Sequence, residues 1–163
     1  MATKLKNLSK HNSKEIPSAK NMRFGIVVSE WNSEITNAMA DAAEKTLLEF
    51  GASKKNIFIH YVPGSFELTL GAKYLAEYTK ADAIICIGCV IQGETKHFDF
   101  ICQGVAYGIT ELSIQYGKPF IFGVLTTNNL QQAKDRSGGK HGNKGIEAAV
   151  TAIKMLGLRN KLT

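Results

Sequence analysis

With 163 residues, 44% of them hydrophobic, the chain is long enough for one domain with its own core and too short for two. Its formal net charge of +6 lies mostly in residues 1–20, which hold five lysines and one glutamate, so the other residues together carry only +2. A basic nucleic-acid-binding surface on the body is therefore not expected. The chain lacks both the ~20-residue apolar stretch of a membrane span and the apolar run of a signal peptide, which predicts a cytoplasmic protein that does not bind membranes.

Residues 1–20 are predicted to form a polar arm ahead of a single α/β domain over residues 21–163. The lysines of the arm are spaced apart and it has no aromatic residues. This pattern favours an arm that is solvated or docked on a partner over one that binds RNA or a membrane.

The domain begins with an apolar, β-branched run at residues 23–30, which predicts a strand. A helix is expected next, capped by Asn32 or Ser33 and ended by Gly51. Its apolar residues recur at helical spacing on one stripe: Ile35, Ala38, Met39, Ala42, Ala43, Leu47 and Phe50.

The same unit recurs twice. A strand at 56–62 precedes a helix at 66–80, in which apolar residues stand four apart at Phe66, Leu70, Tyr74 and Tyr78. A third strand at 82–90 precedes a helix that starts near His97 and runs to Gly117, with Ile101, Val105, Ile109 and Leu112 at helical spacing.

Three cysteines, an odd number, indicate reduced thiols rather than a disulfide framework. Cys86 and Cys89 lie inside the third strand, where residues three apart point to opposite faces. They are expected to be small core residues. No second C-x-x-C motif is present and the histidines lie in unrelated segments, so a metal site is not expected.

A fourth strand at 119–126 is followed by helical segments at 129–135 and 144–156, which a glycine-rich basic loop separates. Strands that are almost wholly apolar and alternate with amphipathic helices predict a parallel sheet covered on both faces. The fold expected is α/β, a three-layer αβα sandwich with a four-stranded parallel sheet, flavodoxin-like. Ligands of such sheets bind beyond the carboxyl ends of the strands.

The turn QGETKH, residues 92–97, is the most unusual of the loops at that edge. Gly93 permits close approach of a ligand, and the amides that open the next helix favour an anion, with Thr95 as a further donor. Ordinary helix capping explains the same residues equally well. His97, at the helix start beside this turn, is interpreted as a general acid and base, and a histidine packed at a helix end is the alternative.

Other loops at this edge carry further candidates. Trp31 could stack on a planar ring or simply pack at the rim, and Glu67 could accept hydrogen bonds from ligand hydroxyls or serve the helix dipole. Arg136, Lys140 and Lys144 in the glycine-rich loop suit a phosphate clamp. That loop does not match a Walker A motif, and no G-x-G-x-x-G follows the first strand, so NTPase and dinucleotide functions are disfavoured.

Taken together, these motifs resemble the 6,7-dimethyl-8-ribityllumazine synthase family of riboflavin biosynthesis. The similarity runs from about Phe24 to Gly157 and consists of five ordered segments: WN (31–32), VPGSFE (62–67), GCVIQGETKHFDF (88–100), FGVLTTNN (122–129) and DRSGGKHGNKG (135–145). The chain departs from the usual family pattern with Trp31 for Phe, Gln92 for Arg and Ser137 for Ala, none of which removes a chemical role.

The resemblance implies a transferase that condenses 5-amino-6-(D-ribitylamino)uracil with 3,4-dihydroxy-2-butanone 4-phosphate and needs neither a metal nor another cofactor. It implies that His97 moves protons. The implied contacts to the pyrimidine and the ribityl chain come from Trp31, Ser65, Phe66, Glu67, Val90, Ile91, Phe122 and Lys144. The implied phosphate site consists of Gly93, Glu94, Thr95 and Arg136.

Family members are homopentamers, and some form icosahedral shells of 60 subunits. The resemblance implies that Phe122, Arg136 and Lys144 reach the site from a neighbouring subunit, and it leaves a riboflavin synthase partner open. The short loop between the last two helices favours a shell, and the N-terminal arm is expected to dock on a neighbour. Three other functions remain as alternatives: a flavin or lumazine carrier without catalysis, a purely structural shell protein, and nucleic-acid binding through the arm.

Overall fold

The computed structural model describes residues 9–163. One four-stranded parallel sheet runs in the order β2-β1-β3-β4 and consists of β1 (Phe24–Ser29), β2 (Ile57–Val62), β3 (Ala83–Ile91) and β4 (Phe120–Thr127). The α-helices are α1 (Ser33–Glu49), α2 (Leu68–Tyr78), α3 (His97–Tyr116), α4 (Leu130–Arg136) and α5 (Lys144–Leu162). Short 3-10 turns occur at Ser13–Glu15 and Lys54–Asn56.

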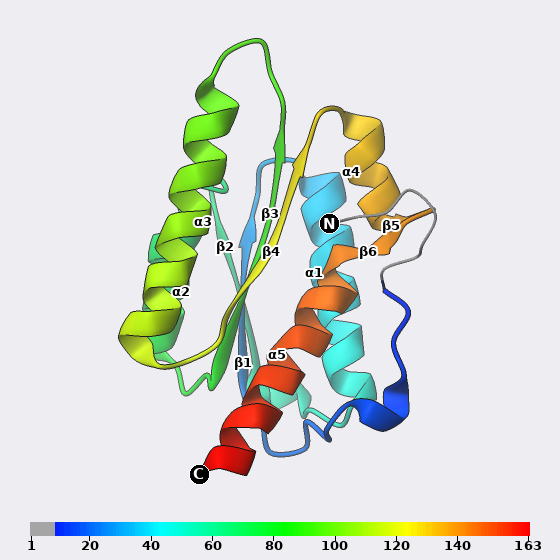
Figure 1. Ribbon diagram of the computed structural model, residues 1–163, viewed down its shortest axis with the longest axis vertical. Coiled ribbons are helices and arrows are strands. Elements are labelled where there is room, and N and C mark those ends of the chain that lie inside the picture. The colour runs from blue at the N-terminus through cyan, green and yellow to red at the C-terminus, as the bar shows by residue number, and fades with distance from the viewer. Residues whose placement is uncertain (1–8) are drawn as a thin grey trace.

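The helices cover both faces of the sheet. Helices α2 and α3 lie on one face, and α1, α4 and α5 lie on the other (Figure 1). Each helix layer encloses one apolar core between itself and the sheet. Cys86 and Cys89 belong to different cores, because strand residues three apart point to opposite faces. The predicted flavodoxin-like, three-layer sandwich is thereby confirmed.

Two of the predicted helix ends are correct in place. Gly51 and Gly117 both adopt positive φ, 94° and 56°; Gly51 follows the C-cap residue Phe50 of α1, and Gly117 is itself the C-cap of α3. The cap of α1 lies at one of the predicted residues, but its side chain does not make the predicted capping hydrogen bond. Asn32 occupies the cap position in the left-handed region, but its amide donates to the carbonyl of Cys89 at 2.9 Å instead of bonding its own helix.

The apolar residues that stand four apart in the predicted helix at 66–80 identify α2 but not its buried face, and the first of them, Phe66, lies in the turn before α2. Phe66, Leu70, Tyr74 and Tyr78 are 50% to 79% exposed. The face that packs on the sheet carries Leu68, Ala72, Leu75 and Ala76. We call the exposed apolar surface of α2 and α3 the outer face; on α3 it continues with Phe100, Tyr107 and Ile114.

The segment ahead of β1 packs on the α1 and α5 side. Ile16 and Ala19 are buried in the core of that side, and the Ala19 N–H donates to the carbonyl of Phe50 at 2.8 Å. Residues 1–8 of the predicted arm lie outside the described residues. The boundary at residue 20 between arm and domain stays a prediction.

The glycine-rich loop between α4 and α5 contains an antiparallel hairpin that the sequence did not predict, formed by β5 (Ser137–Gly139) and β6 (Gly142–Asn143). The Asn143 side chain then caps α5 by accepting from the Gly145 N–H at 2.8 Å. Only glycine fits at 145, because a Cβ there would lie 1.8 Å from the Met39 carbonyl oxygen. The hairpin therefore seats the start of α5 directly against α1.

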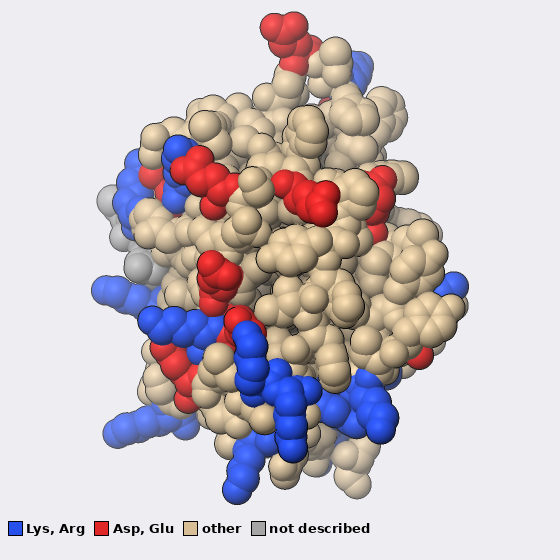
Figure 2. Space-filling model, turned by 180° about the vertical axis from the view of Figure 1, so that it is seen from behind, with Lys and Arg blue, Asp and Glu red and all other residues tan. Residues whose placement is uncertain are grey.

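Charges are unevenly distributed on the surface. Seen from behind, lysines and arginines gather toward the lower end, where the strands begin, and few lie around the loops that follow the strands (Figure 2). Among residues 9–163, no helix is both long and apolar enough to span a membrane.

Candidate active site

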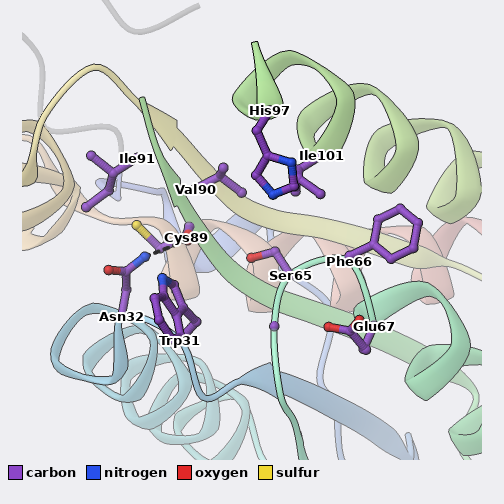
Figure 3. A pocket seen from close by; sticks show the side chains of 11 residues that line it. Trp31, Asn32, Ser65, Phe66, Glu67, Cys89, Val90, Ile91, His97 and Ile101 are labelled. Carbon is purple, nitrogen blue, oxygen red and sulfur yellow. Dashed lines mark hydrogen bonds between the residues drawn. The ribbon is translucent and has the colours of Figure 1, made fainter. Parts of the chain in front are cut away.

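A pocket of about 660 Å³ lies where β1, β2 and β3 end (Figure 3). Its walls come from the loops that follow β1 and β2, from the end of β3 itself and from the first turns of α3. Of the predicted site residues, it brings together Trp31, Ser65, Phe66, Glu67, Val90, Ile91 and His97. It also contains four residues that had no predicted ligand role: Asn32, Gly64, Cys89 and Ile101.

Trp31 is held at the rim by its backbone. The N–H of Glu30 donates to the Val62 carbonyl at 2.8 Å, and the N–H of Trp31 donates to the Pro63 carbonyl at 3.2 Å. The indole itself is 73% exposed, so its flat face is available for stacking. Asn32, next in sequence, ties this turn to β3 through the hydrogen bond to Cys89. Asn32 has a left-handed backbone with a φ of 61°, and this conformation could not be predicted from the sequence.

The loop before α2 supplies polar groups without internal partners. The Glu67 side chain makes no capping hydrogen bond to its helix. Ser65 is 7% exposed, and among residues 9–163 its hydroxyl has no hydrogen-bond partner. A buried hydroxyl and a carboxylate beside a pocket can both bind a ligand rich in hydroxyl groups.

His97 is the first residue of α3, and its ring points from that helix toward Ser65, on the side of the pocket opposite Trp31 and Glu67 (Figure 3). The N–H of His97 donates to the Thr95 hydroxyl at 3.3 Å. The Thr95 hydroxyl thus satisfies one backbone N–H at the start of α3, whereas the cap position itself is Lys96, which makes no side-chain capping bond. Because the Thr95 oxygen accepts the bond from His97, the hydroxyl proton remains able to donate to an anion.

Gly93, Glu94 and Thr95 form an exposed turn next to the pocket and are not among its lining residues. A Cβ placed on Gly93 would meet nothing within 4 Å. The turn is thus open to a ligand or to another chain. Its start is fixed to the sheet by the N–H of Gln92, which donates to the Thr127 carbonyl at 2.7 Å.

The other predicted site residues do not reach this pocket within one chain. Phe122 is partly buried on β4 and packs against the core under α2 and α3. Arg136 and Lys144 line a second pocket beside the carboxyl end of β4, together with Thr127 and Lys140.

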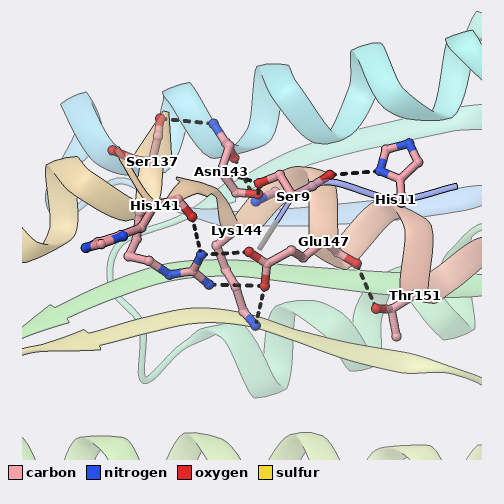
Figure 4. A network of polar contacts seen from close by, with 10 residues as sticks. Ser9, His11, Ser137, His141, Asn143, Lys144, Glu147 and Thr151 are labelled. Atoms are coloured by element: carbon pink, nitrogen blue, oxygen red, sulfur yellow. Dashed lines mark hydrogen bonds and ion pairs between the residues drawn. The ribbon is translucent and has the colours of Figure 1, made fainter. Parts of the chain in front are cut away.

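A carboxylate that sequence reasoning missed organises this second pocket. Glu147 accepts from Arg136 through both of its oxygens, at 2.8 and 3.1 Å, and Lys144 donates to it at 3.5 Å (Figure 4). The three-residue spacing between Lys144 and Glu147 on one helix was the available signal. The contact to Arg136 depends on the hairpin and had no signal in the sequence.

The thiols near the site are poorly suited to chemistry. Burial raises the pKa of Cys89 to about 11 and also raises the pKa of Cys86, so both stay protonated near neutral pH. Within residues 9–163, no three His, Cys, Asp or Glu side chains lie close enough together to hold a metal ion.

Comparison with known proteins gives one consistent result. The family model described as 6,7-dimethyl-8-ribityllumazine synthase matches residues 21–160. A protein of that name from Cytophaga hutchinsonii is 58% identical over 156 residues, which cover 96% of this chain and 98% of the relative. Proteins of the same name from Porphyromonas gingivalis and Flavobacterium johnsoniae are each 55% identical; they cover 97% and 99% of this chain, and 98% and 85% of their own lengths.

Proposed function

The chain belongs to the 6,7-dimethyl-8-ribityllumazine synthase family, and on that premise we propose that it is a transferase that condenses 5-amino-6-(D-ribitylamino)uracil with 3,4-dihydroxy-2-butanone 4-phosphate. The products are 6,7-dimethyl-8-ribityllumazine, phosphate and water, in riboflavin biosynthesis. One observation carries the proposal: a single pocket unites the exposed indole of Trp31 and the carboxylate of Glu67, from two separate loops, with the imidazole of His97 at the start of α3.

The aminouracil occupies the pocket between Trp31 and β3. Trp31 stacks on the pyrimidine, and Val90 and Ile91 form the opposite apolar wall. The backbone at Ser65 and Phe66 binds the ring, while Glu67 accepts hydrogen bonds from the ribityl hydroxyls. Two features support this arrangement: the hydroxyl of Ser65 has no partner among residues 9–163, and the carboxylate of Glu67 makes no capping hydrogen bond to α2.

The butanone phosphate binds beside His97. The Gly93–Thr95 amides, the Thr95 hydroxyl and the positive end of the α3 dipole hold the phosphate, with Arg136 of a neighbouring subunit as its cationic partner. The exposed turn and the free proton of the Thr95 hydroxyl support this site. Glu94 contributes to the same turn.

The reaction consists of proton transfers around carbon–nitrogen bond formation. The amine attacks the ketone, and loss of water gives a Schiff base; elimination then releases phosphate. The ribitylamino nitrogen closes the ring, and a second loss of water completes the lumazine. His97 takes and returns protons in these steps, and the cations stabilise the departing phosphate. Holding both reactants together supplies much of the rate.

The protein works as a cytoplasmic homopentamer with sites shared between neighbouring subunits. Two features support this: the outer face of α2 and α3 is apolar and exposed, and Phe122, Arg136 and Lys144 lie away from the pocket of their own chain. The short hairpin between α4 and α5 supports assembly of pentamers into an icosahedral shell. A riboflavin synthase would be a natural partner, because it consumes the lumazine.

The test is to mix purified protein with the two substrates and follow lumazine by absorbance and fluorescence against a protein-free control. We expect clear acceleration over the slow spontaneous reaction. A background rate together with tight binding of lumazine or riboflavin would replace the synthase with a carrier.

A further inference from the structure

We propose that Glu147 is a positioning residue for the reaction: it turns the guanidinium of Arg136 so that one two-donor edge stays available for the substrate phosphate. The inference rests on the proposed function and adds a residue to it. Glu147 touches no substrate in this proposal and acts only through Arg136.

The hydrogen bonds of Arg136 leave a defined pair of donors. A guanidinium has five N–H groups. Nη1 donates to the His141 carbonyl at 2.9 Å and to Oε1 of Glu147 at 2.8 Å, and Nη2 donates to Oε2 of Glu147 at 3.1 Å. The remaining donors, the Nε–H and the second Nη2–H, share the other edge of the planar group. No residue among 9–163 accepts from this edge.

The free edge has the geometry that a phosphate needs, since two parallel N–H groups of one arginine bind two oxygens of an anion. The orientation is enforced by a largely buried pair: the side chains of Arg136 and Glu147 are 13% and 19% exposed. Lys144 adds a second cation beside the same carboxylate. Two cations around one carboxylate leave a net positive charge at this place.

The local chain holds the pair in register. Arg136 is the last residue of α4, and Glu147 lies in the first turn of α5. Between them, the amide of Asn143 donates to the Ser137 carbonyl at 2.9 Å (Figure 4). It also donates to the Ala38 carbonyl at 3.0 Å, so the hairpin is tied to itself and to α1. The carboxylate is therefore presented to the guanidinium from a fixed position.

The first experiment is steady-state kinetics of Glu147→Gln with each substrate varied. The amide keeps the shape of Glu147 but loses its charge and one acceptor, so the guanidinium can turn. We expect the KM for the butanone phosphate to rise about tenfold, with kcat and the KM for the aminouracil within about twofold of wild type. Glu44→Gln is the matched control, because Glu44 is also 19% exposed and ion-paired, with Lys54; it should change neither KM.

A second pair of variants tests the free edge without altering Glu147. Arg136→Lys keeps a charge that can pair with Glu147 but has no fork, so its KM for the butanone phosphate should rise as far as that of Arg136→Ala. Adding Glu147→Gln to Arg136→Ala should cause no further rise, because there is no guanidinium left to orient.

Several results would overturn the inference: an unchanged or lowered KM for the butanone phosphate in Glu147→Gln, an equal rise for both substrates, a wild-type KM in Arg136→Lys, or additive effects in the double variant. Circular dichroism and sizing of each variant separate these effects from misfolding, and the Arg136→Lys result stands even if Glu147→Gln does not fold.

If wild-type protein itself fails to accelerate lumazine formation, the proposed function is wrong. If wild type is active and Glu147→Gln has normal kinetics, only the role of Glu147 is wrong.

Discussion

Asn143→Ala should be one of the most damaging polar substitutions in the domain. The side chain is buried and makes three hydrogen bonds: its amide donates to Ala38 and Ser137 at 3.0 and 2.9 Å, and its oxygen accepts from Gly145 at 2.8 Å. At about 1 kcal/mol for each bond whose partner is left unsatisfied, the expected loss in free energy of unfolding is about 3 kcal/mol.

Urea unfolding followed by circular dichroism, at one fixed protomer concentration, measures this loss. Asn129→Ala is the control, because the Asn129 side chain makes a single exposed capping bond, to Gln132 at 2.9 Å, and should cost about 1 kcal/mol or less. Asn143→Asp keeps the acceptor for Gly145 but places a carboxylate against two carbonyls, so we expect it to be no more stable than Asn143→Ala. A loss below about 1 kcal/mol in Asn143→Ala would refute the reasoning, and near-wild-type stability of Asn143→Asp would mean that the cap alone matters.

Three further predictions concern catalysis, pH and assembly. His97→Ala should lower kcat by about 10²-fold or more while changing the KM for the butanone phosphate far less, and unchanged turnover would remove His97 from the mechanism. Burial acts to raise the pKa of Asp82, but the hydrogen bonds and charge of Arg23 outweigh it and hold that pKa below its usual value. The pair thus stabilises the fold above the ordinary Asp pKa of about 3.9, and this contribution is lost as pH falls through the lowered folded value. Asp82→Asn should therefore unfold at lower urea than wild type at pH 7, with the difference shrinking on acidification below about pH 4; a constant difference would contradict the assignment. Leu70→Asp, on the outer face, should dissociate the proposed oligomer on a sizing column, and an unchanged elution volume would contradict an interface at this face.

Sequence reasoning located the pocket because the unusual residues follow strands. The parallel arrangement puts the carboxyl ends of β1, β2 and β3 at one edge, and this alone brings Trp31, Glu67 and His97 together from segments far apart in the chain. Asn32 was missed as a lining residue, since its role depends on a left-handed backbone and on a carbonyl of β3. The roles of the individual side chains stay predictions.

Local patterns determined which segments are strands and helices, and in what order. Apolar runs with little alternation indicated buried parallel strands, spacing near 3.6 indicated the helices, and Gly51 and Gly117 marked two of the helix ends, because each of these signals acts over a few neighbouring residues. Those patterns were enough to identify the three-layer fold.

Tertiary structure decided which face of each helix is buried and which charges meet. In α2, the small residues Ala72 and Ala76 allow close packing on the sheet, and the large stripe that includes Leu70 points outward, although both sets recur at helical spacing. Arg136 and Glu147 are eleven residues apart and meet only because the hairpin turns α5 back beside the end of α4. Periodicity reports the type of an element, whereas burial and ion pairing depend on what packs against it, and that is settled only when the whole chain folds.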